Sequence, residues 1–160
     1  MPEPEWRGDH VGKKIAAGAQ FIQTQYCYDV PLLRQFMEKV RENKLHEKAF
    51  FLIGVGPLPS AKTGRWMKNN VPGVHIPEPV LERIEKAKDQ KAEGKQLCID
   101  LIQEISEIEG VAGIHVMAYR QEEFVNEIIH ASGVMKNRKP RRPAQPAATP
   151  SAPGALAAAS

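Results

Sequence analysis

Short apolar runs alternate with longer segments of mixed polarity along most of the chain. The first run, residues 21–25, begins with Phe-Ile and ends in the polar sequence Gln-Thr-Gln. Two further runs, AFFLIGV at 49–55 and IHVMA at 114–118, are apolar almost throughout. Adjacent apolar residues are typical of strands that are covered on both faces, so we predict buried strands at these three places.

The segments between the apolar runs have the spacing of amphipathic helices. Residues 30–43 carry an apolar stripe at helical intervals, with Asp29 as a suitable N-cap and Pro31 in the first turn. Further helices are predicted at 11–17, from Ser60 to Asn69, from Glu78 or Pro79 to Ala87, through 97–105 with Gly110 as the stop, and at 122–131 with an end at Gly133. Trp66 in the third of these is expected to pack against the core, and a ring that stacks on a ligand is the alternative.

This order of elements predicts an α/β fold with parallel strands. The strands should be neighbours in the order 21–25, 49–55, 114–118, because helical crossovers join each to the next. A parallel sheet of only three strands leaves both of its edge strands unpaired. A complete barrel of eight units takes about 250 residues, which is more than this chain has. We therefore predict the C-terminal portion, about three β/α units, of a (β/α)8 TIM barrel.

Composition divides the chain into three parts. Residues 1–11 are expected to be an irregular leader, residues 12–134 the partial barrel, and residues 135–160 a disordered basic tail rich in proline and alanine. The tail carries five basic residues and no acidic one, so removing it from the net charge of +3 leaves −2 for the rest. The folded part is then mildly acidic and offers no basic surface for nucleic acid.

Several classes of protein and site are not indicated. No apolar run approaches the roughly 20 residues of a membrane span, and the first ten residues do not resemble a signal peptide, so a cytoplasmic location is expected. Cys27 and Cys98 lack CxxC spacing, and the five histidines form no HxH or HExxH pattern, so no metal site is predicted. GxGxxG and GxxxxGK[ST] are also absent.

The polar end of the first strand is the candidate ligand site. In parallel α/β folds the carboxyl ends of the strands face the ligand, so Gln23, Thr24 and Gln25 suggest a substrate-reading role. The alternative is that the glutamines are solvated or pair with neighbouring backbone. Lys13 and Lys14 are either a solvated helix face or, if one lies next to the carboxyl end of the strand, a contact for an anion.

Five motifs occur in the order found in methylenetetrahydrofolate reductases. They are AGAQFIQTQYCYD, GVGPLPS, PGVHIPEPVLERIEKAKD, EGKQLCIDLIQEI and GIHVMAYR. The most specific feature is a strand exit with Thr24, Gln25, Tyr28 and Asp29, followed by a loop with Gly56, Leu58 and Pro59. The chain resembles the C-terminal part of that family over about residues 12–134.

The resemblance implies a (β/α)8 barrel that holds FAD at the carboxyl ends of its strands. It implies reduction of 5,10-methylenetetrahydrofolate to 5-methyltetrahydrofolate with NAD(P)H as electron donor. Lys14 matches a lysine that contacts the phosphate or ribitol region of the flavin, and Gln25 matches the glutamine that hydrogen-bonds the folate pterin where the nicotinamide also docks. Arg120 or Gln121 would take the role of the arginine that contacts the folate tail.

The resemblance also implies what is missing. The proton-donating glutamate and an aspartate that tunes the flavin belong to earlier strands, so no catalytic residue is assigned here. The aromatic residue that stacks on substrate in other members falls at Thr63, and Trp66 one turn later is a possible substitute.

Two other functions stay open. The chain is alternatively a non-catalytic half-barrel subunit or remnant that needs an N-terminal partner chain. It is also compatible with a different barrel oxidoreductase or a corrinoid-linked methyl-transfer component. Expected partners are the folate substrate and NAD(P)H, with a homo-oligomer or a complementing N-terminal barrel chain, and without nucleic acid or membrane.

Overall fold

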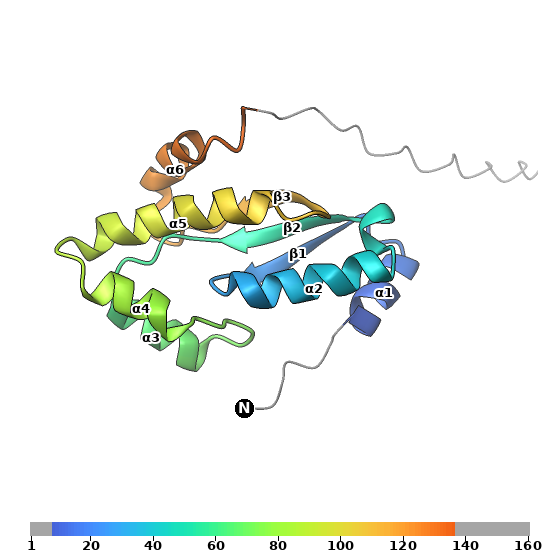
Figure 1. Ribbon diagram of the computed structural model, residues 1–160, viewed down its shortest axis with the longest axis horizontal. Coiled ribbons are helices and arrows are strands. Elements are labelled where there is room, and N and C mark those ends of the chain that lie inside the picture. Colours follow the sequence, from blue (N-terminus) through green and yellow to red (C-terminus); the bar gives the residue numbers. More distant parts are fainter. Residues whose placement is uncertain (1–7, 137–160) are drawn as a thin grey trace, which may run out of the picture.

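The computed structural model describes residues 8–136. Its helices and strands alternate along the chain, as the sequence pattern predicts (Figure 1). They are, in order, α1 (Gly8–Ala16), β1 (Phe21–Tyr26), α2 (Val30–Glu42), η1 (Leu45–Glu47), β2 (Phe50–Val55), α3 (Ala61–Asn70), α4 (Glu78–Glu85), α5 (Gln90–Ser106), β3 (Val111–Val116), η2 (Glu122–Phe124) and α6 (Val125–Ser132). No helix in this part of the chain is long and apolar enough to cross a membrane.

The three strands form one parallel sheet in the order β1-β2-β3. Phe21 pairs with Phe50 at the start of the β1–β2 ladder, and Ile53 pairs with Ile114 in the β2–β3 ladder. Both pairings are parallel, which confirms the predicted order and direction. The arrangement is compatible with part of a β/α barrel.

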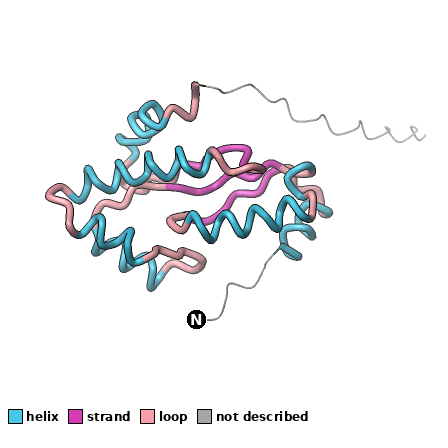
Figure 2. Tube along the Cα trace, in the orientation of Figure 1, coloured by secondary structure: helices cyan, strands magenta, loops and turns pink. Residues whose placement is uncertain are grey.

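Helices α2 and α5 lie side by side against one face of this sheet (Figures 1 and 2). The ring of Phe36 on α2 meets the ring of Phe51 on β2 edge to face, with the ring centroids 6.3 Å apart. Phe51 and Ile53 on β2 are fully buried, as is Ile102 on α5. The core therefore lies between β2 and the two helices.

The opposite face of the sheet is more exposed, and here the prediction for β1 is wrong. Phe21 is 57% exposed and Gln23 is also exposed. Their partners in β2, Phe50 and Leu52, are only half-buried. The two adjacent apolar residues Phe21 and Ile22 suggest burial on both faces, but the described residues cover only the face to which Ile22 belongs.

The third strand begins earlier than predicted. Gly110, expected to end the preceding helix, instead turns the chain with a φ of +96°, and β3 starts at the next residue. Helix α5 has already ended at Ser106. The strand is predominantly half-buried rather than covered on both faces. The small residues Ala112 and Gly113 conceal its start, because they do not read as part of an apolar run.

The ends of the described region differ in part from the expected leader and tail. The leader was expected to be irregular as far as residue 11, but α1 begins at Gly8. At the other end Gly133 terminates α6 in a left-handed conformation, as predicted, and Lys136 N–H donates to its carbonyl oxygen. Residues 1–7 and 137–160, which hold most of the predicted leader and tail, lie outside the described residues.

The predicted N-caps of two helices are confirmed. Asp29 accepts a hydrogen bond from Leu32 N–H at 3.0 Å, and Ser60 accepts one from Thr63 N–H at 3.1 Å. Both side chains satisfy an amide that the first turn of a helix leaves without a main-chain partner.

Trp66 does not pack into the core as predicted, because 59% of its surface is exposed. Helix α3 packs through its small residues Ala61 and Gly64, the latter against Leu81 of α4. The close approach on that side of the helix leaves Trp66 facing away from the core.

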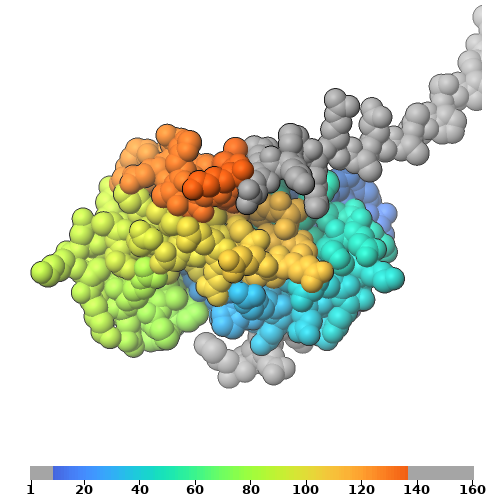
Figure 3. All heavy atoms as spheres, turned by 45° about the horizontal axis from the view of Figure 1, so that its top comes forward, coloured from blue at the N-terminus to red at the C-terminus, as the bar shows by residue number. Residues whose placement is uncertain are grey.

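Helix α6 lies next to α5 (Figure 3). Lys95 of α5 forms an ion pair with Glu127 of α6 at 2.7 Å and lies over the ring of Phe124. Ile128 of α6 is fully buried in this contact region. The segment that follows β3 is therefore packed against α5 through α6.

Candidate functional site

The exits of the three strands meet at one edge of the sheet, since the strands are parallel neighbours. This edge brings together the end of β1 at Gln25, the loop of residues 56–59 after β2, and residues 119–121 after β3. We treat it as the candidate site and refer to it as the carboxyl edge.

Gln25 lies at the carboxyl edge with its side chain exposed to solvent. Its Oε1 accepts a hydrogen bond from Tyr26 N–H at 3.0 Å, which fixes the orientation of the amide. Within the described part of the chain, Nε2 makes no hydrogen bond. Gln25 therefore presents two free N–H donors at the edge where ligands bind in parallel α/β folds.

Two tyrosines tie the exit of β1 to the other two exits. Tyr28 is buried, and its hydroxyl donates to Gly56 O at 3.0 Å. The hydroxyl of Tyr26 donates to Met117 O at 3.4 Å. The two rings are stacked, with their centroids 6.0 Å apart. Burial raises the pKa of Tyr28 well above its ordinary value, so this hydroxyl stays protonated and continues to donate.

The loop after β2 is closely packed. Gly56, Pro57 and Leu58 are buried. The main chain of Leu58 contacts Gly94 of α5 so closely that a side chain at position 94 would overlap its carbonyl group. The loop is therefore packed against α5 at this edge.

Gln121 is buried and contacts the same loop. Its Nε2 donates to Pro57 O at 3.3 Å, while its Oε1 is buried without a hydrogen-bond partner in the described structure. The hydrogen bond from Nε2 therefore joins the exit of β3 to the loop after β2. A buried acceptor without a partner is uncommon, because it has lost its contact with water.

Arg120 lies at the same strand exit, but it is exposed whereas Gln121 is buried. The main chain of Arg120 has a φ of +58°, a left-handed conformation that is unusual for a residue other than glycine. Its N–H donates to Glu122 Oε1 at 3.1 Å, and its guanidinium lies over the ring of Tyr119, 5.2 Å from the centroid. Arg120 and Gln121 are the two residues predicted to contact the folate tail. Arg120 is exposed and has its guanidinium in solvent, whereas Gln121 is buried.

Lys14 is not brought near Gln25. It lies in the last turn of α1, where its carbonyl oxygen accepts from Ala19 N–H just before β1 begins. The lysine is therefore at the amino end of β1, whereas Gln25 is at the carboxyl end. A six-residue strand spans roughly 16 Å, so the two predicted ligand-binding residues stand at opposite ends of the sheet.

Two acidic residues that follow the exits of β1 and β2, Asp29 and Glu78, have structural partners. Asp29 caps α2. Glu78 is held by Arg65 and Lys68 at 2.6 and 3.3 Å. Hydrogen bonds from Arg65 and then Lys68 lower the pKa of Glu78, so this carboxylate is not suited to donate a proton near neutral pH.

The two cysteines are also unsuited to chemistry at this edge. Burial raises the pKa of Cys27 and of Cys98 to about 12 in each case. The reactive species of cysteine is the thiolate, so both side chains are inert at physiological pH. No group of three or more His, Cys, Asp or Glu side chains within residues 8–136 is arranged to hold a metal ion.

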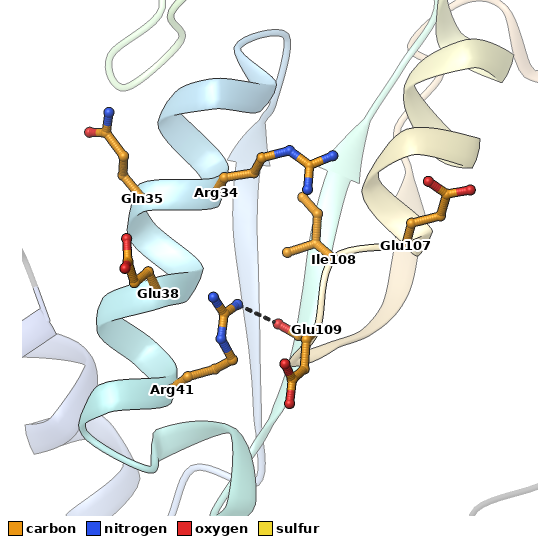
Figure 4. Close-up of a pocket in the computed structure, with 7 residues that line it drawn as sticks. All are labelled: Arg34, Gln35, Glu38, Arg41, Glu107, Ile108 and Glu109. Atoms are coloured by element: carbon orange, nitrogen blue, oxygen red, sulfur yellow. Dashed lines mark hydrogen bonds between the residues drawn. The ribbon is translucent and has the colours of Figure 1, made fainter.

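A groove lies away from the carboxyl edge, between α2 and the segment that joins α5 to β3 (Figure 4). It is lined by Arg34, Gln35, Glu38, Arg41, Glu107, Ile108 and Glu109. Arg41 Nη1 donates to Glu109 O at 2.8 Å, and Arg34 lies 3.7 Å from Glu104. Because both guanidinium groups already have protein partners, we assign no ligand to this groove.

Sequence reasoning named Thr24 and Tyr28 without predicting their contacts, and it missed a third contributor to the site. Thr24 bonds across to β2, Tyr28 pins the loop after β2, and residues 71–77 run beside the exit of β1 through a parallel bridge between Cys27 and His75. The two tyrosines that follow Gln25 in the sequence were the available signal for the role of Tyr28. The other two depend on residues about 30 and 48 positions away in the chain.

Comparison with known proteins identifies one family. The family model for methylenetetrahydrofolate reductase matches residues 2–133. No curated protein matches the chain. The matched region includes every described strand and nearly all of the described residues.

Proposed function

Because the chain belongs to the methylenetetrahydrofolate reductase family, we propose that it binds 5,10-methylenetetrahydrofolate at its carboxyl edge and takes part in its reduction to 5-methyltetrahydrofolate. The family is one of oxidoreductases of folate one-carbon metabolism. Its reaction uses FAD, which when bound carries a hydride from NAD(P)H to the folate. A cytoplasmic location is part of the same proposal.

The observation that carries the proposal is the amide of Gln25. Its oxygen is held by Tyr26 N–H, and its nitrogen is left as a donor in solvent. A pterin ring carries carbonyl and ring-nitrogen acceptors that such a donor can bind. An amide that is already fixed in orientation loses little freedom on binding, which favours the ligand.

Arg120 is the residue we propose for the carboxylate-bearing tail of the folate. Its guanidinium is exposed at the exit of β3, two strands from Gln25 along the same edge. Strands are about 4.8 Å apart, so the main chains of the two exits are separated by roughly 10 Å. Gln121, which is buried against Pro57, is better suited to holding the loop than to contacting this tail.

The described residues do not by themselves fit FAD. The one flavin-contacting candidate, Lys14, lies at the amino end of β1 and is not near Gln25. The acidic side chains Asp29 and Glu78 are engaged in a helix cap and in ion pairs. We therefore assign the chain substrate binding and positioning, and assign no step of hydride or proton transfer to its residues.

A second function, a half-barrel that associates with further strands, is favoured by a different observation. In the described sheet, β1 and β3 are both edge strands, and Phe21 is 57% exposed on the face that no helix covers. Open edges and an exposed apolar face favour association with another chain segment. The partner would be a complementing N-terminal barrel segment or a second copy of the chain.

The test of substrate binding compares Gln25→Ala with Gln23→Ala. Both glutamines are exposed on β1, but only Gln25 lies at the carboxyl edge. We expect Gln25→Ala to weaken the binding of 5-methyltetrahydrofolate about tenfold, since a lost hydrogen bond to a buried ligand group costs about 1–3 kcal/mol. Gln23→Ala should leave the affinity within about twofold. Equal effects of the two variants, or none from either, would contradict the proposal.

Flavin content separates the two functions. The chain is purified and its absorbance near 450 nm is measured with and without added FAD. Stoichiometric flavin together with NAD(P)H-dependent reduction of the folate would favour a complete active site. A colourless chain whose melting temperature rises only when a partner segment is added would favour the half-barrel.

A further inference from the structure

The hydroxyl of Thr24 occupies a place in the β1–β2 ladder that is normally taken by a main-chain carbonyl. Gly54 N–H donates to Thr24 Oγ1 at 2.9 Å, and Thr24 Oγ1 in turn donates to Gln25 O at 2.9 Å. In an ordinary parallel ladder an N–H of one strand bonds a carbonyl oxygen of its neighbour. One side chain thus links β2 to the main chain of Gln25.

The ladder is irregular at this point. Gln23 pairs with Leu52, and the next pair joins Tyr26 to Gly54. Two residues of β1 therefore stand opposite one residue of β2, which is the arrangement of a β-bulge. Bulges re-aim the side chains at the end of a strand and are frequent beside active sites.

Gly54 provides the space that the bulge needs. A Cβ at this position would lie 2.8 Å from Thr24 O and 2.9 Å from Gln25 O, closer than carbon and oxygen atoms approach in proteins. The main chain of the bulge therefore rests directly on Gly54. The observation is independent of the hydroxyl contacts, and it locates the same two residues of β1 in the same place.

The bulge determines how Gln25 is presented. Its main-chain oxygen is bonded by Thr24 and its side-chain oxygen by Tyr26 N–H. Gly73, from the segment beside β1, lies nearby, so that a Cβ at position 73 would be 3.9 Å from Gln25 Cγ. Of the two polar atoms of the side chain, Nε2 then remains without a hydrogen bond within the described residues. The side chain is held as a donor that faces away from the protein.

We propose that Thr24 is a positioning residue, which acts through the bulge to hold the amide of Gln25 as a donor toward an acceptor atom of the ligand. The part that concerns the ligand rests on the proposed function. The part that concerns the bulge does not, because it follows from the contacts of Thr24, Gly54 and Gln25 alone.

The first experiment tests the bulge without a ligand. Amide hydrogen exchange is measured by NMR on the nitrogen-15-labelled chain and on Thr24→Val and Thr24→Ser. Valine keeps the shape of threonine but has no hydroxyl, so Gly54 N–H should exchange about tenfold faster, and the side-chain amide signal of Gln25 should shift. Serine keeps the hydroxyl, so Thr24→Ser should keep the exchange rate of Gly54 N–H within about twofold of the natural chain. The side-chain amide signal of Gln25 should then stay near its original position.

The amide of Ile53 serves as the internal reference for this experiment. Exchange that rises at Gly54 and not at Ile53 reports a local change, as the proposal requires. Unchanged exchange at Gly54 in Thr24→Val would overturn it, and so would equal acceleration at both amides in a variant that still melts normally. If Thr24→Val does not fold, Thr24→Ala takes its place.

The second experiment measures the affinity for 5-methyltetrahydrofolate of Thr24→Val, Gln25→Ala and the double variant. We expect Thr24→Val to weaken binding about tenfold and to add nothing once Gln25 is alanine, because two residues that act through one contact are not additive. Fully additive losses would overturn the positioning role. A Gln25→Ala variant with unchanged affinity would instead contradict the proposed function, and the exchange experiment would still decide the role of Thr24.

Discussion

The main chain of Leu58 fills the space in which residue 94 would carry a side chain. A Cβ on Gly94 would lie 2.7 Å from the carbonyl carbon of Leu58 and closer still to its oxygen. This contact joins the N-terminal part of α5 to the loop after β2. It makes the glycine a requirement of packing, although a glycine within a helix ordinarily lowers its stability.

Gly94→Ala is therefore expected to lower the free energy of unfolding by about 3 kcal/mol, because the loop or the helix must move to admit one methyl group. The matched control is Gly12→Ala in α1, where a Cβ would meet no atom within 4 Å. That variant should gain up to about 1 kcal/mol from the higher helix propensity of alanine. Urea denaturation measures both, and a stabilised Gly94→Ala variant would refute the contact.

Two phenylalanines on neighbouring strands should respond very differently to truncation. Phe51 is fully buried between β2 and the helices, whereas Phe21 is 57% exposed on the uncovered face. Phe51→Ala is expected to cost about 3–5 kcal/mol, as buried phenylalanines do. Phe21→Ala should cost less than about 1 kcal/mol in the monomer.

The same pair reports on association. Sedimentation at increasing protein concentration measures whether the chain self-associates and whether Phe21→Ala weakens that association. A loss of several kcal/mol from Phe21→Ala in a strictly monomeric chain would mean that the face is covered after all.

Both thiols should be unreactive in the folded chain. Burial raises the pKa of Cys27 and Cys98 to about 12, from an ordinary value of 9.0. A disulfide reagent at pH 8 is expected to label the native chain much more slowly than the chain in urea, where the thiolate forms readily. Native labelling at the unfolded rate would show that the thiols are accessible.

The same raised pKa values predict how stability changes at alkaline pH. The folded state retains the thiol protons more strongly than the unfolded state does. The stabilisation is therefore complete below pH 9 and is lost as the pH rises from 9 toward 12. Melting temperatures measured across this range for the chain and for Cys98→Ala separate the thiol contribution, which the variant should reduce.

Glu78 links α3 to the start of α4, and its contribution to the stability of the fold should be lost in acid. Hydrogen bonds from Arg65 and Lys68 lower its pKa below the ordinary value of 4.5. Its stabilisation is thus present above pH 4.5 and is lost as the pH falls through the lower value of the folded state. Glu78→Gln should melt slightly earlier than the natural chain at pH 7, since exposed ion pairs contribute little, and should match it in strong acid.

Glu82→Gln is the control, because Glu82 pairs with Lys86 within one helix rather than between two. A difference between Glu78→Gln and the natural chain that persists in strong acid would assign its effect to something other than the ion pairs.

The order of the strands was predictable because local signals mark each element. Asp29 and Ser60 are caps that the structure retains, and apolar runs mark where β1 and β2 begin. The start of β3 was not predictable in this way. Val111 and Gly113 belong to the strand because their main chain pairs with β2, and such pairing leaves no trace in side-chain hydrophobicity.

Exposure was predicted less well than the order of the elements, for a physical reason. Phe21 and Trp66 are apolar, and the sequence alone does not say what covers them. Trp66 faces outward because α3 packs through Ala61 and Gly64, a choice made by the shapes of neighbouring helices. Burial is a property of two surfaces, and a pattern along one segment describes only one of them.

The candidate site shows the same division. Gln25 was predicted from its place at the end of a strand, and the structure has it exposed at that end. Its hydrogen bonds come from the neighbours Thr24 and Tyr26, whereas the main chain packed around it belongs to Gly54 and Gly73, which are distant in sequence and carry no side chain to suggest a role. The ligand-binding roles of Lys14, Gln25, Arg120 and Gln121 stay predictions until a ligand is measured.

The parallel bridge between Cys27 and His75 also bears on the order of folding. It closes a loop of 48 residues, and the main-chain pairing of β1 with β2 closes one of 29 between Phe21 and Phe50. Contacts between more distant residues require more chain entropy to be lost before they form. The surroundings of Gln25 are thus expected to be completed only after the β1–β2 ladder is in place, so that a chain still emerging from the ribosome pairs its first two strands before it completes its ligand edge.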